Sequence, residues 1–317
     1  MRLRFLAWMF AIGALAMSAA RAQDFPSKPI RIVTGAPGGS SDFTARLIAQ
    51  GLTDNLRQQV IVDNRGNVDG ELVAKAPPDG YTLVIDGASI WIGPLVQKAP
   101  YDPVRDFAPV TLAVSAPNVV IVQPSIPVKS IRELIALAKA QPGKLNYSSG
   151  GIGASSHLAA ELFKSMAGVA IVNVNYKGTG PALNALIANE VQVMFVNPAI
   201  ASPHIKSERV RALAVASLGP SPLMPDLPTV AAAGLPGFES VVLQGMFAPA
   251  GTPPARVTLL SREIAKVLNR PDVKERHFNT GVETVASTPE ELAARIKSEM
   301  AKWGKVIKDA GIRPDKS

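Results

Sequence analysis

The feature that most constrains the fold is an alternation of short β-rich runs with amphipathic stretches, and it occurs twice along the chain. In the first half, IRIVTGA precedes DFTARLIAQGLTDNL, which has apolar residues near helical spacing at Leu47, Ile48, Leu52 and Leu56. In the second half, SIRELIALAKAQPG, LNYSS, HLAAELFKSMAG and IVNVNY again alternate helix and strand. Strands that alternate with helices form mostly parallel sheets. The sequence therefore predicts an α/β protein with two α/β units.

Two of the expected helices carry clear start signals. Ser130 and Glu133 form a capping box, and Pro142-Gly143 stops the helix that follows. Thr288 and Glu291 form a second capping box before the long C-terminal helical pattern. These signals fix where each helix begins.

Two extended runs flank the second unit, NVVIVQPS before it and SVVLQGMFAPA after it. Both are placed to cross between the units as a two-strand hinge, which makes the first unit discontinuous. The predicted division is a leader over residues 1–22, a first lobe over 23–122 and 244–317, and a second lobe over 123–243.

The N-terminal residues have the order of a secretory signal peptide. A basic MRLR precedes the apolar FLAWMFAIGALAMSAA, and Ala20-Arg21-Ala22 offers a cleavage site after Ala22. The alternative, a membrane anchor, needs roughly 20 apolar residues and a stop-transfer flank. We expect export to the periplasm, and the chain has 0 cysteines, so no disulfide framework holds it. The formal charge of +8 has no basic block behind it and aromatic residues are 5%, which argues against nucleic-acid binding.

Two loops rich in glycine and serine, PGGSSD and SSGGIGASS, each join an expected strand to an expected helix. In parallel α/β sheets, ligands gather at the carboxyl ends of strands. Glycine lets the backbone approach a ligand, and a helix N-terminus offers unpaired N–H groups. A single such loop is more often a helix cap or a turn, but one from each unit indicates a cleft that holds a small carboxylate. The hydroxyl groups available are those of Ser40, Ser41, Ser148, Ser149, Ser155 and Ser156.

Enzyme and nucleotide sites have weaker support. Gly151-x-Gly153-x-x-Ser156 is only part of a dinucleotide fingerprint, and no Walker lysine or G-x-S-x-G elbow is present. The histidines His157, His204 and His277 lack the spacing of a metal site or a triad. We therefore expect no catalytic residue, no metal and no cofactor. A catalytic role for His157, beside the second loop, stays open.

The chain resembles the Bug (Bordetella uptake gene) family, the solute receptors of tripartite tricarboxylate transporters. The likeness runs from FPSKPIRIV to KWGKVIKDAGI and includes PGGSSD, PPDGYTL, YDPVRDFAPV, KLNYSSGGIG, YKGTGPAL, MPDLPTV and APAGTP. It implies a two-domain periplasmic binding protein fold of type II-like form, with the ligand carboxylate held between the lobes.

The resemblance also implies site residues, carried over position by position. Those that match the family's two loops are Gly38, Gly39, Ser40 and Asp42, then Ser148, Ser149, Gly150, Gly153, Ser156 and His157. To these we add Ser41, Asp86, Ser89, Lys177 and Asn197, which lie in the same loops or near strand ends. Lys177 and Asp86 are placed to meet a charged end of the ligand.

Three departures from the family pattern leave the ligand open. GNVDGELVAK follows Asn64-Arg65 where a glycine-rich insert is usual, Asp86 stands where a small residue is usual, and Val196 replaces an aspartate. An acidic Asp86 suggests a ligand with an amino or other cationic group.

The expected function is an extracytoplasmic receptor that closes on a small organic carboxylate and delivers it to a membrane permease. We expect a monomer that is not an enzyme. The alternatives are a periplasmic sensor that docks to a signalling protein, and an enzyme that uses His157 or a loop serine.

Overall fold

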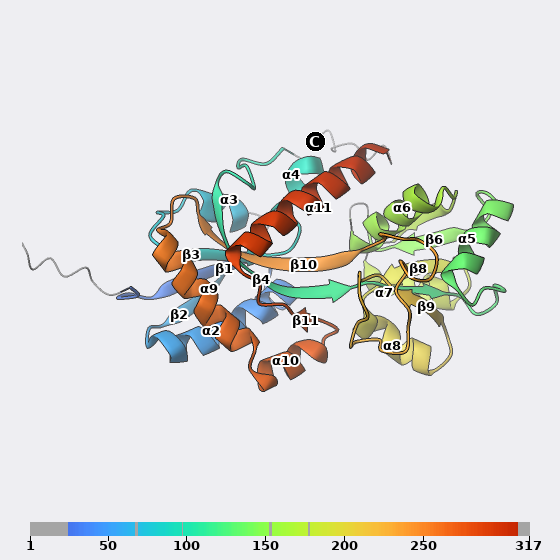
Figure 1. Cartoon of the computed structure of the whole chain (residues 1–317). Coiled ribbons are helices and arrows are strands. Elements are labelled where there is room, and N and C mark those ends of the chain that lie inside the picture. The colour runs from blue at the N-terminus through green and yellow to red at the C-terminus, as the bar shows by residue number, and fades with distance from the viewer. Residues whose placement is uncertain (1–24, 67–68, 97, 152–153, 177, 310–317) are drawn as a thin grey trace, which may run out of the picture.

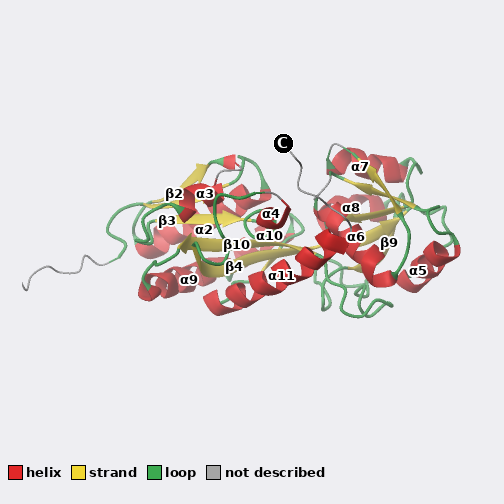
Figure 2. Ribbon diagram, turned by 90° about the horizontal axis from the view of Figure 1, so that it is seen from above, coloured by secondary structure: helices red, strands yellow, loops and turns green. Residues whose placement is uncertain are grey.

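The computed structural model describes residues 25–66, 69–96, 98–151, 154–176 and 178–309. These residues form two α/β lobes, each with its own sheet, which lie side by side in Figure 1 and, seen from above, in Figure 2. The two-lobe α/β architecture expected from the sequence is confirmed. The predicted signal peptide, residues 1–22, lies outside the described residues.

The first lobe is built on a six-stranded sheet of order β11-β4-β10-β3-β1-β2. Its strands are β1 (Ile30–Thr34), β2 (Val60–Asn64), β3 (Thr82–Asp86), β4 (Phe107–Pro117), β10 (Val241–Pro249) and β11 (Glu283–Thr284). Here β1 runs parallel to β2 and β3, whereas β10 is antiparallel to β3 and β4. The helices are α2 (Ser40–Leu56), α3 (Asp69–Ala74), α4 (Gly93–Val96), α9 (Pro254–Leu268), α10 (Pro271–Phe278) and α11 (Pro289–Asp309).

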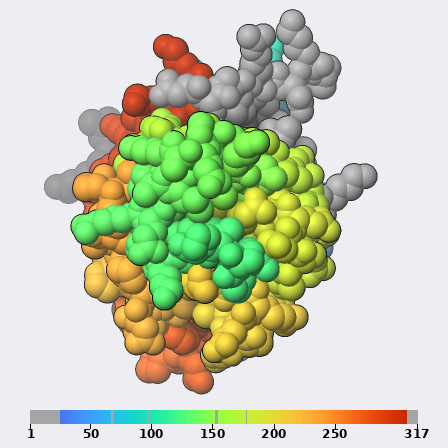
Figure 3. Space-filling model, turned by 90° about the vertical axis from the view of Figure 1, so that its right-hand side faces the viewer, coloured from blue at the N-terminus to red at the C-terminus, as the bar shows by residue number. Residues whose placement is uncertain are grey.

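The second lobe has a five-stranded sheet of order β7-β6-β8-β5-β9. Its strands are β5 (Val119–Val122), β6 (Asn146–Ser149), β7 (Val172–Asn175), β8 (Val193–Val196) and β9 (Arg211–Val215). Its helices are α5 (Ile131–Ala140), α6 (Ser155–Ala167), α7 (Thr179–Ile187) and α8 (Pro198–Lys206). Figure 3 views this lobe end-on, where its green to yellow segments form a rounded outer surface.

The long strands β4 and β10 run from the first lobe to the second (Figure 1). At their lobe-2 ends the Asn118 N–H donates to the Ser240 carbonyl at 3.1 Å, and the Ser240 N–H donates to the Ala216 carbonyl at 2.8 Å. The chain thus enters the second sheet at Asn118 and leaves it at Ser240.

The lobe boundaries drawn from the sequence need correction at both crossings. The sequence pattern places residues 119–122 in the first lobe, but they are β5, which pairs with β8 and β9. It places residues 241–243 in the second lobe, but they pair with β4. Pro117 and Asn118 interrupt the apolar pattern where the chain changes sheets, but extended runs lie on both sides of them and hide the exact boundary.

Buried side chains fill both lobes, and α11 joins them. Phe163, Phe195 and Phe238 pack together in the second lobe, with ring centroids 5.7 to 6.3 Å apart. The buried face of α11, including Leu292 and Trp303, packs on β4 and reaches α6. Figures 1 and 2 both show α11 lying along the hinge strands toward the second lobe. Helix α11 therefore borders the junction between the lobes.

Candidate functional site

A cavity of about 620 Å³ lies between the lobes, on one side of the hinge strands. The first lobe contributes α2, α10, β4 and β10, and the second lobe contributes the starts of α6, α7 and α8. The residues that line it are Gly38, Gly39, Ser40, Phe43, Thr44, Val114, Ala116, Ser155, Thr179, Asn197, Ile200, Val242, Gln244, His277, Thr280 and Val282.

Four helices point their N-termini at this cavity. Ser40, Ser155 and Thr179 are the first residues of α2, α6 and α7, and Asn197 is the N-cap of α8. None of α2, α6 and α7 has a side-chain hydrogen bond at its cap. The starts of α2, α6 and α7 carry unpaired N–H groups and about half a positive charge each, whereas at α8 the Ala199 N–H already donates to Asn197 Oδ1. Together they form a strong electrostatic trap for an anion.

The described lining residues add no formal charge to this trap. Among the described residues that line the cavity, none is Asp, Glu, Lys or Arg. The one titratable side chain among them is His277, which is fully buried, and burial lowers its pKa. Within the described lining, backbone dipoles and hydroxyl groups therefore face the cavity.

The first loop is held in place by a buried carboxylate. The Gly38 N–H donates to Asp42 Oδ2 at 2.9 Å, and Asn64 Nδ2 donates to Asp42 Oδ1 at 2.9 Å and to the Gly35 carbonyl at 2.9 Å. Burial acts to raise the pKa of Asp42, but hydrogen bonds from Arg46, Asn64 and Gly38 hold it below its ordinary value. Asp42 is ionised at neutral pH and fixes the loop from behind.

Asp86 connects the first turn of α2 with the loop after β3. Its carboxylate accepts hydrogen bonds from Ser41 Oγ and Ser89 Oγ, both at 2.8 Å, and from the Gly87 N–H at 2.7 Å. Asp69, which is 5% exposed, faces it. Burial and the charge of Asp86 raise the pKa of Asp69 to about 7. Asp86 thus already has partners at both carboxylate oxygens.

The second loop follows β6 and turns into α6. Ser148 is fully buried, and its hydroxyl group has no hydrogen-bond partner in the described part of the chain, whereas Ser149 Oγ donates to Asn173 Oδ1 at 2.9 Å. The Gly150 N–H donates to Ser156 Oγ at 3.1 Å. His157 is buried behind the loop, stacked on Tyr147 with centroids 6.5 Å apart, and burial lowers its pKa.

Two expected site residues, Gly153 and Lys177, lie outside the described residues. Another expected site residue, Asn197, is described and joins the lobes. Its Oδ1 accepts from the Ala199 N–H at 2.8 Å, and its Nδ2 donates to the Gly281 carbonyl at 3.0 Å. The family departure Val196 is a core residue of β8, 2% exposed.

Several lining residues were not singled out from the sequence. Thr179 is the first residue of α7 and lies in the segment GTGP, where two glycines and a proline signal a helix start. Ser240 and Gln244 are the polar residues of the run SVVLQGMF, and Gln244 Nε2 donates to Ser40 Oγ. His277 and Thr280 come from α10 and the turn after it, for which the sequence carries no local signal.

Other kinds of site have no support in the part of the chain that the structure describes. No group of three or more His, Cys, Asp or Glu side chains is arranged to hold a metal ion there. None of the helices described is both long and apolar enough to cross a membrane.

Comparisons with known proteins agree with this geometry. The family model described as "Tripartite tricarboxylate transporter family receptor" matches residues 44–312. The chain is 35% identical over 300 residues to Protein BugT of Bordetella pertussis, covering 92% of each chain.

Two similar solved structures hold organic acids. R. palustris Rpa4515 with adipate is 36% identical, with a TM-score of 0.73, over 92% of this chain and 100% of that one. MatC from Rhodopseudomonas palustris with bound malate is 31% identical, with a TM-score of 0.68, over 89% of this chain and 100% of that one.

Proposed function

The chain belongs to the family of tripartite tricarboxylate transporter receptors, and we propose that it binds a small organic carboxylate in the cavity between its two lobes. The observation that carries the proposal is the convergence of four helix N-termini on a cavity whose described lining has no charged side chain. Such ends bind carboxylates without a formal countercharge. The adipate and malate in the two similar structures support the same ligand class.

Ligand capture proceeds by closure of the lobes about β4 and β10. The lobes are residues 25–117 with 241–309, and residues 118–240, as the two sheets divide the chain. A ligand that bonds Ser40 of one lobe and Ser155 and Thr179 of the other stabilises the closed form, because the open form cannot offer both sets of contacts.

The binding residues are the lining residues at the helix starts, with the second loop behind them. Gly38, Gly39 and Ser40 meet the carboxylate from the first lobe. Ser148 and Gly150 shape the second lobe's side. Ser41, Asp42, Asp86, Ser89, Ser149, Ser156 and His157 fix the two loops, since their polar groups bond within the protein or lie buried behind the cavity. Asn197 lines the cavity and links the two lobes at its edge through the Gly281 carbonyl.

Delivery completes the role. The protein is exported through its predicted signal peptide, works in the periplasm and hands the ligand to a membrane permease. Binding rather than chemistry is the function, and the buried place of His157, outside the lining of the cavity, supports this. A sensor docked to a signalling protein would use the same site, and an enzyme would convert the bound ligand.

The test is a screen of carboxylates by thermal shift, followed by calorimetry, on protein stripped of ligand by unfolding and refolding. A ligand at 100 times its dissociation constant adds about 2.7 kcal/mol to the free energy of unfolding. We expect Gly38→Asp to abolish binding, because it places a carboxylate at the rim of the anion site.

Gly38→Asn is the matched control. Gly38 has φ of +77°, and no atom lies within 4 Å of the point that a Cβ atom would occupy, so either side chain has room. Asn tolerates this backbone region about as well as Asp. Retained affinity in Gly38→Asp, or equal loss in both variants, contradicts the proposed site. Consumption of the bound carboxylate would point to an enzyme instead.

A further inference from the structure

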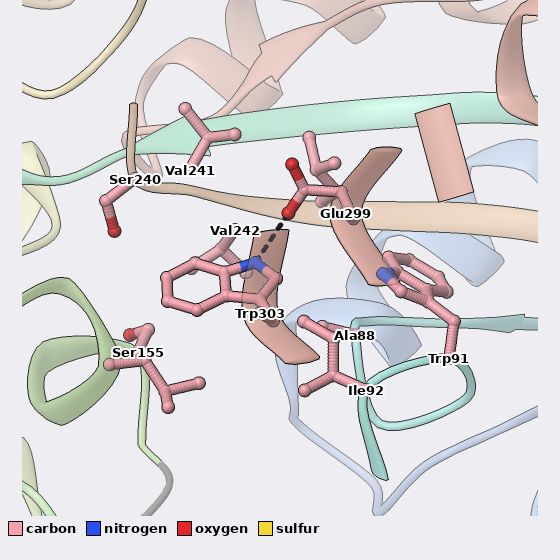
Figure 4. Close-up of a pocket in the computed structure, with 11 residues that line it drawn as sticks. Ala88, Trp91, Ile92, Ser155, Ser240, Val241, Val242, Glu299 and Trp303 are labelled. Carbon is pink, nitrogen blue, oxygen red and sulfur yellow. Dashed lines mark hydrogen bonds between the residues drawn. The ribbon is translucent and has the colours of Figure 1, made fainter. Parts of the chain in front are cut away.

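A second, smaller cavity lies beside the hinge strands, between the loop after β3, α6 and α11 (Figure 4). Its volume is about 100 Å³. Trp91 and Ile92 come from the first lobe, Leu158 comes from the second, and Trp303 comes from α11. Because its walls belong to both lobes, this cavity is complete only when the lobes are together.

The smaller cavity adjoins the carboxylate cleft. Ser155 and Val242 border both cavities. Ser155 is the first residue of α6, one of the helix ends that face the anion. A ligand whose carboxylate lies at that end can therefore extend the rest of its body into the smaller cavity.

The walls are mostly apolar, and their charged group is already neutralised. Glu299 accepts a hydrogen bond from Trp303 Nε1 at 2.7 Å (Figure 4) and pairs with Lys302 at 2.6 Å and Arg295 at 3.2 Å. Its carboxylate has enough partners to need nothing from a ligand. A second carboxylate placed here would lose its hydration in mostly apolar surroundings, and Arg295 and Lys302 already pair with Glu299.

One polar atom in the walls is left without a partner. Trp91 is 1% exposed, and its Nε1 has no hydrogen-bond partner among the residues that the structure describes. Figure 4 shows this nitrogen on the edge of the indole ring that faces Trp303 and Glu299. Buried N–H groups nearly always have an acceptor, so this one is a donor that a water molecule or a bound molecule beside Trp91 can satisfy.

We propose that this tryptophan-walled cavity is the subsite for the uncharged, apolar body of the carboxylate ligand, and that Trp91 Nε1 donates to a neutral oxygen on that body. This inference rests on the proposed function and narrows it. An engineered apolar cavity of about 150 Å³ admits benzene, so a cavity of about 100 Å³ suits a shorter chain of a few carbon atoms. The preferred ligand is then a monocarboxylate with an aliphatic chain and a hydroxyl or carbonyl group near its far end.

The chain provides its own reporter for the test. It contains 3 tryptophans, of which Trp8 lies in the predicted signal peptide, while Trp91 and Trp303 both line this cavity. Fluorescence of the mature protein therefore comes from the cavity walls alone. We expect 6-bromohexanoate, whose bromine quenches indole on contact, to quench it, and bromoacetate, which reaches only the helix ends, to quench it much less.

Two variants separate the parts of the proposal by calorimetry with acetate, hexanoate, 6-hydroxyhexanoate and adipate. Ala88→Leu fills the cavity and should weaken hexanoate at least about tenfold while leaving acetate unchanged. Trp91→Phe keeps the ring but removes the N–H, and should weaken 6-hydroxyhexanoate about fivefold with little effect on hexanoate. Wild-type protein should bind hexanoate more tightly than adipate.

The outcomes distinguish this subsite from the site it extends. Equal affinity of wild type and Ala88→Leu for hexanoate overturns the subsite, as does tighter binding of adipate than of hexanoate, and the proposed function stands in both cases. Equal loss of acetate and hexanoate in Ala88→Leu also overturns it, because the variant then acts on the whole cleft. If none of the carboxylates binds wild-type protein, the proposed function itself fails.

Discussion

Both lobes present helix N-termini to the cavity, but they differ in how many they present and in which side chains hold the loops behind them. The second lobe presents the starts of α6, α7 and α8, whereas the first lobe presents only that of α2. Behind α2 lie the carboxyl groups of Asp86, of Asp69, whose pKa is raised to about 7, and of Asp42, which pairs with Arg46, while the second loop is fixed by hydroxyl and amide groups such as those of Ser149 and Ser156. The positive potential is therefore greater on the second lobe, and we expect the ligand's charge to lie nearer to it.

The largest expected effect comes from placing a carboxylate on the second lobe. Ser155→Asp should leave folding intact, because an acidic residue in the first turn stabilises a helix. It should weaken binding more than about 100-fold, since like charges in contact cost several kcal/mol. Calorimetry with a carboxylate found by screening measures this, with Ser155→Asn as the neutral control. A larger loss in Ser40→Asp than in Ser155→Asp would reverse the comparison of the lobes.

The next effect concerns the contact between the lobes at Gly281. A Cβ atom there would lie 2.3 Å from Asn197 Oδ1 and 2.8 Å from the Ala199 N–H nitrogen, at a φ of +72°. Gly281→Ala should hold the lobes apart, weaken binding about tenfold and enlarge the radius of gyration of the liganded protein in X-ray scattering. Gly143→Ala is the control, because Gly143 has the same φ of +72° and nothing within 4 Å. If both variants lose the same amount of affinity, the strain of alanine at this φ, rather than the contact with Asn197, is responsible for the loss.

The next prediction concerns the role of the Asp86 carboxylate in ligand affinity. Since its carboxylate oxygens bond Ser41, Ser89 and Gly87, we expect Asp86→Ala to loosen the start of α2 and to weaken every carboxylate by a similar factor of about three to ten. Recognition of a cationic group, the hypothesis drawn from the sequence, requires selective loss of amino-bearing ligands in the same titrations. Unchanged affinity of Asp86→Ala for all ligands contradicts both the role of Asp86 at the start of α2 and its recognition of a cationic group.

The next prediction asks how much the Asp42 carboxylate, which holds the first loop, contributes to the stability of the protein. Asp42→Asn turns an amide NH2 toward groups that now donate to the carboxylate, so we expect the free energy of unfolding to fall by about 1 to 3 kcal/mol. Urea denaturation measures this. Glu71→Gln, which breaks the exposed pair with Lys75, should change stability by less than about 1 kcal/mol. An unaltered midpoint for Asp42→Asn would mean that the loop does not depend on this carboxylate.

The last prediction is a pH dependence of stability from Asp69. Its pKa in the folded protein, about 7, lies above the ordinary value of 3.8, with Asp86 and the hydroxyl group of Tyr101 facing it. Between these two pH values the folded state holds a proton that the unfolded state has lost, so this group's contribution to stability falls as pH rises from about 4 to about 7. Asp69→Asn should flatten that part of the stability profile. A profile that stays as steep in Asp69→Asn assigns the slope to other groups.

Local features of the fold were predictable. The capping box of Ser130 and Glu133 forms, with the Glu133 N–H donating to Ser130 Oγ at 3.2 Å, and the box of Thr288 and Glu291 does the same at 3.2 Å. The two glycine-rich loops precede α2 and α6 as expected. These predictions succeed because each depends on residues within a few positions of one another.

The sequence alone determined the two α/β units, the starts of their main helices and the two loops between strand and helix, because periodicity and capping are local properties. Only the tertiary structure decided which groups meet. Gln244 reaches Ser40, Asn197 reaches Gly281, and Trp91 lines a cavity with Trp303. Such pairs lie far apart in the chain, and a hydrogen bond depends on distance and direction in space. A sequence pattern does not contain distances and directions in space, so the shape of the cleft and of its apolar extension could be read only from the tertiary structure.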